Sequence, residues 1–101
     1  MKKSTVLVNT SRGGIVNEND LYQALKSKKI RGAGMDVFIS EPPESNHPFF
    51  QLNNILLTPH NAALTLECRR RMSLEASENI FYFLKNMPEL NEDNLVNKKF
   101  L

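Results

Sequence analysis

The stretch TVLVNTSRGG, residues 5–14, is the most informative part of this sequence for the fold. Its first half is a short run of β-branched and apolar residues, the pattern of a strand buried on both faces in a parallel sheet. Gly13 and Gly14 then permit backbone conformations that other residues avoid. Because ligands bind beyond the carboxyl ends of parallel strands, residues 10–14 are the first place to look for a site.

A helix is expected after this turn, from about residue 18 to residue 28. Asn17 is a candidate N-cap, Glu18 and Asp20 fall in the first turn, and lysines gather at the far end, so the charges complement the helix dipole. The expected buried stripe consists of Leu21, Leu25 and Ile30.

Two further strands are predicted, at residues 32–38 (GAGMDVF) and 54–58 (NILLT), the second halted by Pro59. A strand, helix, strand succession indicates an α/β fold with a parallel crossover. The segment between these strands is irregular. Its expected anchors to the core are Phe49, Phe50 and Leu52.

A long amphipathic helix is expected from Leu66 to about residue 86, with Thr65 as its candidate N-cap. Apolar residues recur there at three- and four-residue steps: Met72, Ala76, Ile80 and Phe83 or Leu84. We therefore divide the chain into a domain at residues 1–86 and a polar tail at residues 87–101.

Composition excludes several classes of function. With 101 residues, 41% of them hydrophobic, the chain fits one small domain, and its net charge of +2 is too weak to predict nucleic-acid binding. A single cysteine, Cys68, cannot form an intrachain disulfide, which favours the cytoplasm. No apolar stretch approaches the roughly 18 residues of a membrane span, so no membrane partner is expected.

Each predicted strand ends near a residue that could do chemistry. Arg12 follows the first strand, Asp36 lies near the end of the second with Glu41 five residues on, and His60 follows the third. Taken alone, each is more often structural: a solvated arginine, a turn-bonding aspartate, a capping histidine. Neighbouring parallel strands would bring them into one cleft, and this convergence favours a functional site.

The same residues carry a resemblance to a known family. Residues 9–18 (NTSRGGIVNE) resemble the arginine motif of the D-2-hydroxyacid dehydrogenases, the group that contains phosphoglycerate dehydrogenase and the glycerate and hydroxypyruvate reductases. Residues 32–38 with Glu41 resemble the family's aspartate and glutamate motif, and residues 54–60 its histidine motif. The resemblance implies the second half of a Rossmann-like dinucleotide-binding domain, closed by a long C-terminal helix.

It also implies catalytic roles for Arg12, Glu41 and His60 in transferring a hydride between NAD(H) and a small 2-keto or 2-hydroxy acid. Arginine pairs with a carboxylate in bidentate fashion, and histidine changes protonation near neutrality. A carboxylate such as Glu41 would orient the imidazole and favour its charged form. By position, the resemblance implies that NAD is bound by Thr10, Ser11, Arg12, Asp36, His60 and Ala63, with Asp36 on the nicotinamide amide. NADP and the identity of the hydroxy acid stay open.

One expected feature is missing from these 101 residues: the G-x-G-x-x-G loop that brings a pyrophosphate to a helix N-terminus. We therefore expect the C-terminal portion of such an enzyme, inactive in isolation, which forms a homo-oligomer or associates with a missing N-terminal half. The alternative is a non-catalytic binding or scaffold remnant of the same fold.

Overall fold

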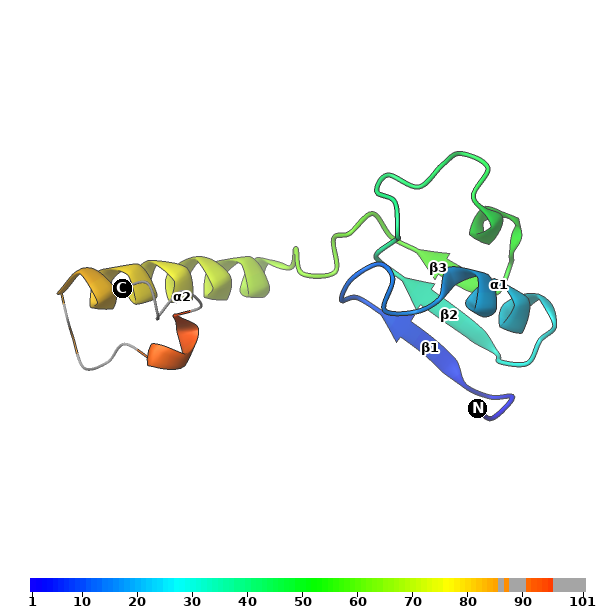
Figure 1. Ribbon diagram of the computed structural model, residues 1–101, viewed down its shortest axis with the longest axis horizontal. Helices are drawn as coiled ribbons and strands as arrows, with labels where there is room; N and C mark the ends of the chain where they lie inside the picture. Colours follow the sequence, from blue (N-terminus) through cyan, green and yellow to red (C-terminus); the bar gives the residue numbers. More distant parts are fainter. Residues whose placement is uncertain (86, 88–90, 96–101) are drawn as a thin grey trace. The chain divides into compact units, whose positions relative to one another are not determined.

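The computed structural model describes residues 1–85, 87 and 91–95. The chain divides into two compact units, Met1–Ala62 and Ala63–Leu101. The first unit holds the sheet and the second a long helix, as the element labels in Figure 1 show. Every predicted site residue except Ala63 belongs to the first unit.

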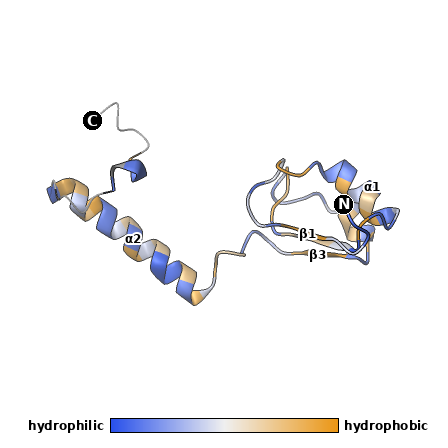
Figure 2. Ribbon diagram, turned by 90° about the horizontal axis from the view of Figure 1, so that it is seen from below, coloured by the Kyte–Doolittle hydropathy of each residue, from blue (hydrophilic) through white to orange (hydrophobic). Residues whose placement is uncertain are grey.

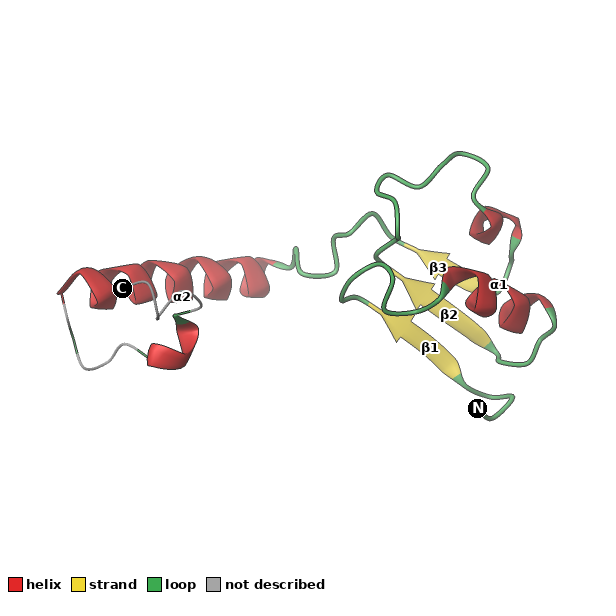
Figure 3. Cartoon of the chain, viewed as in Figure 1, coloured by secondary structure: helices red, strands yellow, loops and turns green. Residues whose placement is uncertain are grey.

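The first unit is built on a three-stranded parallel sheet of order β1-β2-β3 (Figure 3). The strands are β1 (Val6–Asn9), β2 (Gly32–Met35) and β3 (Ile55–Leu57), each slightly shorter than expected. Val8 pairs with Gly34, which pairs in turn with Leu56. The parallel register confirms the α/β prediction, and it places the carboxyl ends of all three strands at one edge.

Helix α1 (Glu18–Lys26) begins as predicted, because the Asn17 side chain accepts a hydrogen bond from Asp20 N–H at 3.0 Å. It ends two residues before the expected residue 28. Lys28 has φ of 54°, a left-handed conformation that stops a helix.

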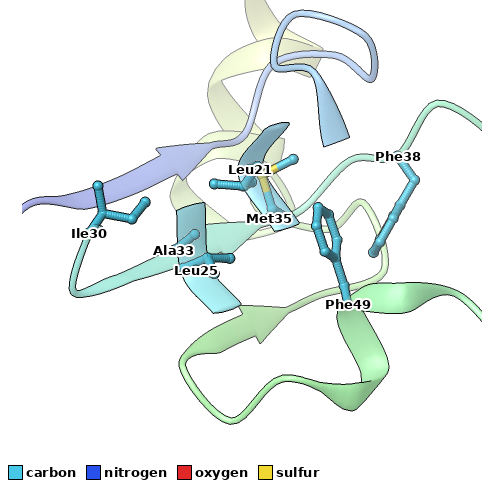
Figure 4. Close-up of a cluster of buried hydrophobic side chains, with 7 residues drawn as sticks. All are labelled: Leu21, Leu25, Ile30, Ala33, Met35, Phe38 and Phe49. Carbon is cyan, nitrogen blue, oxygen red and sulfur yellow. The ribbon is translucent and has the colours of Figure 1, made fainter. Parts of the chain in front are cut away.

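The hydrophobic core lies between α1 and one face of the sheet (Figure 4). Phe49 reaches it from the short 3-10 helix η1 (Pro48–Gln51) and is 1% exposed. Leu52 packs against this core too, but Phe50 is 51% exposed, so its predicted anchoring role is wrong. A single 3-10 turn directs neighbouring side chains to different sides, and Phe49 takes the inner one. The core residues are Leu21, Leu25, Ile30, Ala33, Met35, Phe38 and Phe49.

The opposite face of the sheet is open, so the prediction of a first strand buried on both faces is wrong. Val6, Val8 and Leu56 are 55%, 68% and 70% exposed. Side chains alternate between the faces of a strand, and α1 covers the face that carries Ala33 and Met35. The apolar run correctly predicted a strand but not which of its faces is covered in this chain.

The second unit contains α2 (Leu66–Lys85) and the 3-10 turn η2 (Glu92–Asn94). Thr65 caps α2 as predicted, accepting a hydrogen bond from Cys68 N–H at 3.2 Å. Apolar and polar residues alternate along the helix (Figure 2), and none of its residues is buried. Residue 86 and most of the tail predicted at residues 87–101 lie outside the described part of the chain, and the domain division at residue 86 stays a prediction. Within the described residues, no helix combines the length and apolarity needed to cross a membrane.

Candidate active site

The turn after β1 is shaped by Asn9, a residue that is only 5% exposed. Its side-chain oxygen accepts a hydrogen bond from Ser11 N–H at 3.1 Å, and its amide donates to the Arg12 carbonyl, also at 3.1 Å. This pair of bonds closes the turn from within. The Arg12 side chain is exposed and donates to the Ser11 carbonyl at 2.7 Å, so the guanidinium lies on the solvent side of the turn.

The two glycines of this turn, Gly13 and Gly14, satisfy different structural requirements. Gly14 has φ of 81°, which side chains disfavour. Gly13 has no such dihedral, but a Cβ built there would lie 1.9 Å from the carbonyl oxygen of Phe38. The arginine turn therefore packs directly against the backbone of the segment that follows β2.

Asp36 joins the ends of β2 and β3. Its carboxylate accepts hydrogen bonds from the Thr58 hydroxyl and from the backbone N–H groups of Asn61 and Ala62, the last two at 2.9 Å. The Thr58 hydroxyl contributes most to lowering the pKa of Asp36, and the two N–H groups lower it further against the effect of burial. Oδ2 accepts one of these three bonds and keeps an acceptor position for another donor.

His60 and Glu41 form the central pair of the site. Nδ1 of His60 lies 2.7 Å from Oε2 of Glu41, and Oε1 of Glu41 accepts a hydrogen bond from Phe38 N–H at 3.0 Å. The bond to His60 is the largest cause, and the Phe38 N–H the next, of the lowered pKa of Glu41. Gly13, next to Arg12, packs against the carbonyl of the same Phe38 whose N–H binds Glu41, so the structure brings all three predicted catalytic residues to one edge.

The backbone of His60 is held in an uncommon conformation. Its φ is 54°, in the left-handed region that non-glycine residues seldom occupy. The next two N–H groups along the chain are those bound by Asp36, and they fix the turn that presents the imidazole. The Asp36 side chain thus supports the geometry of His60 besides any role toward a ligand.

A hollow of about 250 Å³ opens beside the pair. Its walls are mostly apolar apart from Glu41 and His60, an arrangement typical of small-molecule sites. The lining residues are Phe38, Glu41, Pro42, Pro43, Pro59 and His60.

The remaining predicted residues are placed as follows. Thr10 and Ser11 are exposed at the end of β1, beside Arg12. Ala63 starts the second unit, and its part in cofactor binding stays a prediction. In the described residues, no cluster of three or more His, Cys, Asp or Glu side chains could hold a metal ion.

Sequence reasoning missed the residues that support the site. Asn9 and Thr58 are polar residues at or just beyond strand ends, and this position was the signal that could have identified them. Glu18 and His47 gave no such signal, because their contacts join segments 29 residues apart.

Comparison with known proteins bears directly on this arrangement. Residues 1–62 match the family model described as "D-isomer specific 2-hydroxyacid dehydrogenase, NAD binding domain". A human glyoxylate reductase/hydroxypyruvate reductase is 45% identical over 92 residues, which cover 91% of this chain and 28% of that protein. A D-3-phosphoglycerate dehydrogenase from Archaeoglobus fulgidus is 40% identical over 95 residues, which cover 94% of this chain and 18% of that protein.

Solved structures agree with the sequence comparisons. An acyclic imino acid reductase in complex with NADPH and D-Arg superposes with a TM-score of 0.76 at 39% identity, covering 89% of this chain and 28% of that one. This likeness, with the parallel sheet and the long α2, confirms the predicted Rossmann-like fold. The chain spans less than a third of each of these relatives.

Proposed function

Because this chain belongs to the D-isomer specific 2-hydroxyacid dehydrogenase family, we propose that it supplies the acid–base and substrate-binding residues of an NAD-dependent oxidoreductase acting on 2-hydroxy acids. The observation that carries the proposal is the 2.7 Å contact between His60 Nδ1 and Glu41, at the same sheet edge as the Arg12 turn. In reduction of a 2-keto acid, a cation can bind the substrate carboxylate, an imidazole can donate the proton and a carboxylate can orient that imidazole, while the hydride comes from a cofactor.

His60 is assigned the proton transfer. Nδ1 of His60 is hydrogen-bonded to Glu41, so the proton passes between Nε2 of His60 and the substrate oxygen. In reduction the charged imidazole donates this proton to the carbonyl oxygen as the alcohol forms. In oxidation the neutral ring accepts it, because Glu41 selects the tautomer with hydrogen on Nδ1 and leaves the Nε2 lone pair free.

We assign binding of the substrate carboxylate to Arg12. The guanidinium is exposed beyond β1 and offers a planar fork of donors that stays charged at any working pH. In the structure it bonds only the adjacent Ser11 carbonyl among described partners, and an incoming carboxylate would compete for those donors. Binding the carboxylate at Arg12 orients the neighbouring carbonyl carbon for reaction.

A nicotinamide cofactor supplies the hydride when bound. We infer that its nicotinamide end lies beside Thr10 and Ser11, which are exposed hydroxyls, and that its amide N–H takes the remaining acceptor position on Oδ2 of Asp36, a side chain that is 3% exposed. NAD is the cofactor that the family description names, and NADP is not excluded, since the imino acid reductase binds NADPH.

The pyrophosphate-binding loop must come from elsewhere, because the 101 residues contain no G-x-G-x-x-G. Two apolar surfaces support association with an N-terminal portion of the enzyme or with a second copy. One is the open sheet face formed by Val6, Val8 and Leu56. The other is a hollow of about 320 Å³ beside β1. Strand β1 pairs only with β2 among the described strands, so its other edge is open to a further strand. We place the assembled enzyme in the cytoplasm, in keeping with a chain that has a single cysteine.

The test is to co-express the chain with the N-terminal portion of a relative and follow NADH oxidation with glyoxylate or hydroxypyruvate. We expect turnover from the combination and none from the chain alone. His60→Gln should lower kcat by about 10²–10⁴-fold, the range for loss of a general acid. Absence of turnover with every 2-keto acid tried, or full turnover by His60→Gln, would contradict the proposal.

A further inference from the structure

Glu18, the first residue of α1, touches none of the catalytic side chains, yet it is bound to the segment that carries Glu41. Its Oε1 accepts a hydrogen bond from Ile39 N–H at 2.8 Å, and its Oε2 lies 3.3 Å from Nε2 of His47. The Glu18 and His47 side chains are each 16% exposed, so water screens the contact less than it would on an open surface.

His47 is itself held in place. Phe49 N–H donates to Nδ1 at 3.3 Å, so the neutral ring carries its hydrogen on Nε2 and donates it to Glu18. The imidazole packs edge-on against Phe38 and Phe49, with ring centroids 5.5 Å and 4.9 Å away. Because the His47 ring is fixed and its Nε2 carries the hydrogen, the hydrogen bond from Nε2 holds the Glu18 carboxylate in one position.

The peptide that Glu18 binds is next to the one that Glu41 binds. Phe38 N–H donates to Glu41 and Ile39 N–H donates to Glu18, so two carboxylates hold successive N–H groups of one segment. The Phe38 carbonyl is also the group against which Gly13 packs. Movement of this segment would therefore disturb both the support of Glu41 and the arginine turn.

We propose that the Glu18–His47 pair is a positioning device for the catalytic pair: by fixing the Phe38–Ile39 segment, it keeps the Glu41 carboxylate against Nδ1 of His60. The effect on turnover rests on the function proposed above. The effect on the His60 ring does not, and it can be measured in the 101-residue chain without cofactor or substrate.

The tautomers of the two histidines supply the first readout. At alkaline pH, where both rings are neutral, ¹⁵N spectra of the imidazoles show which nitrogen carries the hydrogen. We expect Nδ1–H for His60 and Nε2–H for His47 in the unmodified chain. Glu18→Ala should convert at least half of His60 to the Nε2–H form, and Glu18→Gln, which keeps an oxygen for Ile39 N–H, should restore much of the Nδ1–H form.

Asp20→Asn is the matched control. It removes one acidic charge from the same helical turn, and Asp20 is exposed and forms no hydrogen bond with residues 38–41. The His60 tautomer should be unchanged in it. A Glu18→Ala chain that folds, as judged by dispersed amide signals, and keeps His60 in the Nδ1–H form would overturn the proposal.

His47→Phe keeps the question answerable if Glu18→Ala does not fold. Phenylalanine preserves the aromatic packing and leaves Glu18 bonded to Ile39 alone, so part of His60 should shift to Nε2–H. An unchanged tautomer in this variant would also contradict the proposal. In the assembled enzyme, Glu18→Ala should lower kcat at least tenfold with less than a threefold change in KM. If Glu18→Ala shifts the His60 tautomer but the unmodified chain in the assembled enzyme shows no turnover, the positioning role stands and the proposed function is refuted.

Discussion

Replacing Gly13 by alanine tests how tightly the arginine turn is joined to the glutamate segment. The added Cβ would lie 1.9 Å from the Phe38 carbonyl oxygen, 2.3 Å from its carbon and 2.7 Å from Ile39 N. Ordinary contact begins near 3.4 Å, so the two backbones must separate by roughly 1.5 Å. All three obstructing atoms belong to the main chain, and no side chain can move aside to relieve the overlap.

The expected cost has two parts. Forced overpacking destabilises a protein by about 1–3 kcal/mol, and the rigid obstruction places Gly13→Ala at the upper end of that range. A displacement of about 1 Å at a reacting group can lower the rate about 100-fold, and we expect a loss of that order in kcat/KM of the assembled enzyme. Part of it should appear in KM for the keto acid, because the Arg12 turn moves, and part in kcat, because the displaced Phe38–Ile39 segment supports Glu41.

Gly14→Ala is the control for this experiment. No atom lies within 4 Å of a Cβ at Gly14, so this variant should show only the cost of about 1–2 kcal/mol for a left-handed backbone. Urea unfolding monitored by amide NMR signals of the first unit measures stability, and the shifts of Phe38 and Ile39 N–H report the separation. If Gly13→Ala leaves those two signals in place and KM unchanged, the turn is not packed as described.

The core and the carboxylates of the first unit allow two further predictions. Leu25 is 1% exposed, and Leu25→Ala should lower the free energy of unfolding by about 2–5 kcal/mol in urea denaturation. Leu56 is exposed, and Leu56→Ala should lower it by under about 1 kcal/mol. Equal losses in the two variants would contradict the assignment of the core. Folding lowers the pKa of Asp36 below 3.8 and that of Glu41 below 4.5, so the stability that these carboxylates contribute is fully present above about pH 4.5 and is lost as acidification proceeds toward their folded-state values. Asp36→Asn should therefore flatten the fall of stability on acidification below pH 3.8, and an unchanged slope in acid titrations would argue against its three hydrogen bonds.

The three strands, their parallel arrangement and the gathering of the candidate residues at one sheet edge were predictable, because the sequence contains local signals for each strand and its end. An apolar run followed by a polar or glycine turn predicts a strand of a parallel sheet, and the candidate site residues Arg12, Asp36 and His60 lie at or just beyond the ends of such runs. The Asn17 and Thr65 caps were predictable for the same reason, since a cap depends on residues three or four positions apart.

The rest depended on contacts between distant segments. Nothing near Val8 indicates which face of its strand a helix will cover, and a 3-10 turn at Phe49 and Phe50 decides which ring is buried. The link between Glu18 and Ile39 spans 21 residues, and the overlap of Gly13 with Phe38 exists only once the strands have paired. Tertiary packing of this kind has no periodic signature in a single sequence.

The central claim is that Glu41 acts through His60 in one catalytic unit. A double-mutant cycle on kcat/KM in the assembled enzyme, with Glu41→Gln, His60→Gln and the double variant, tests it most directly. Glu41→Gln should lose less than His60→Gln, and the double variant should lose no more than His60→Gln alone, because Glu41 has no task once the imidazole is gone. Losses that multiply in the double variant would show two independent roles and contradict the mechanism.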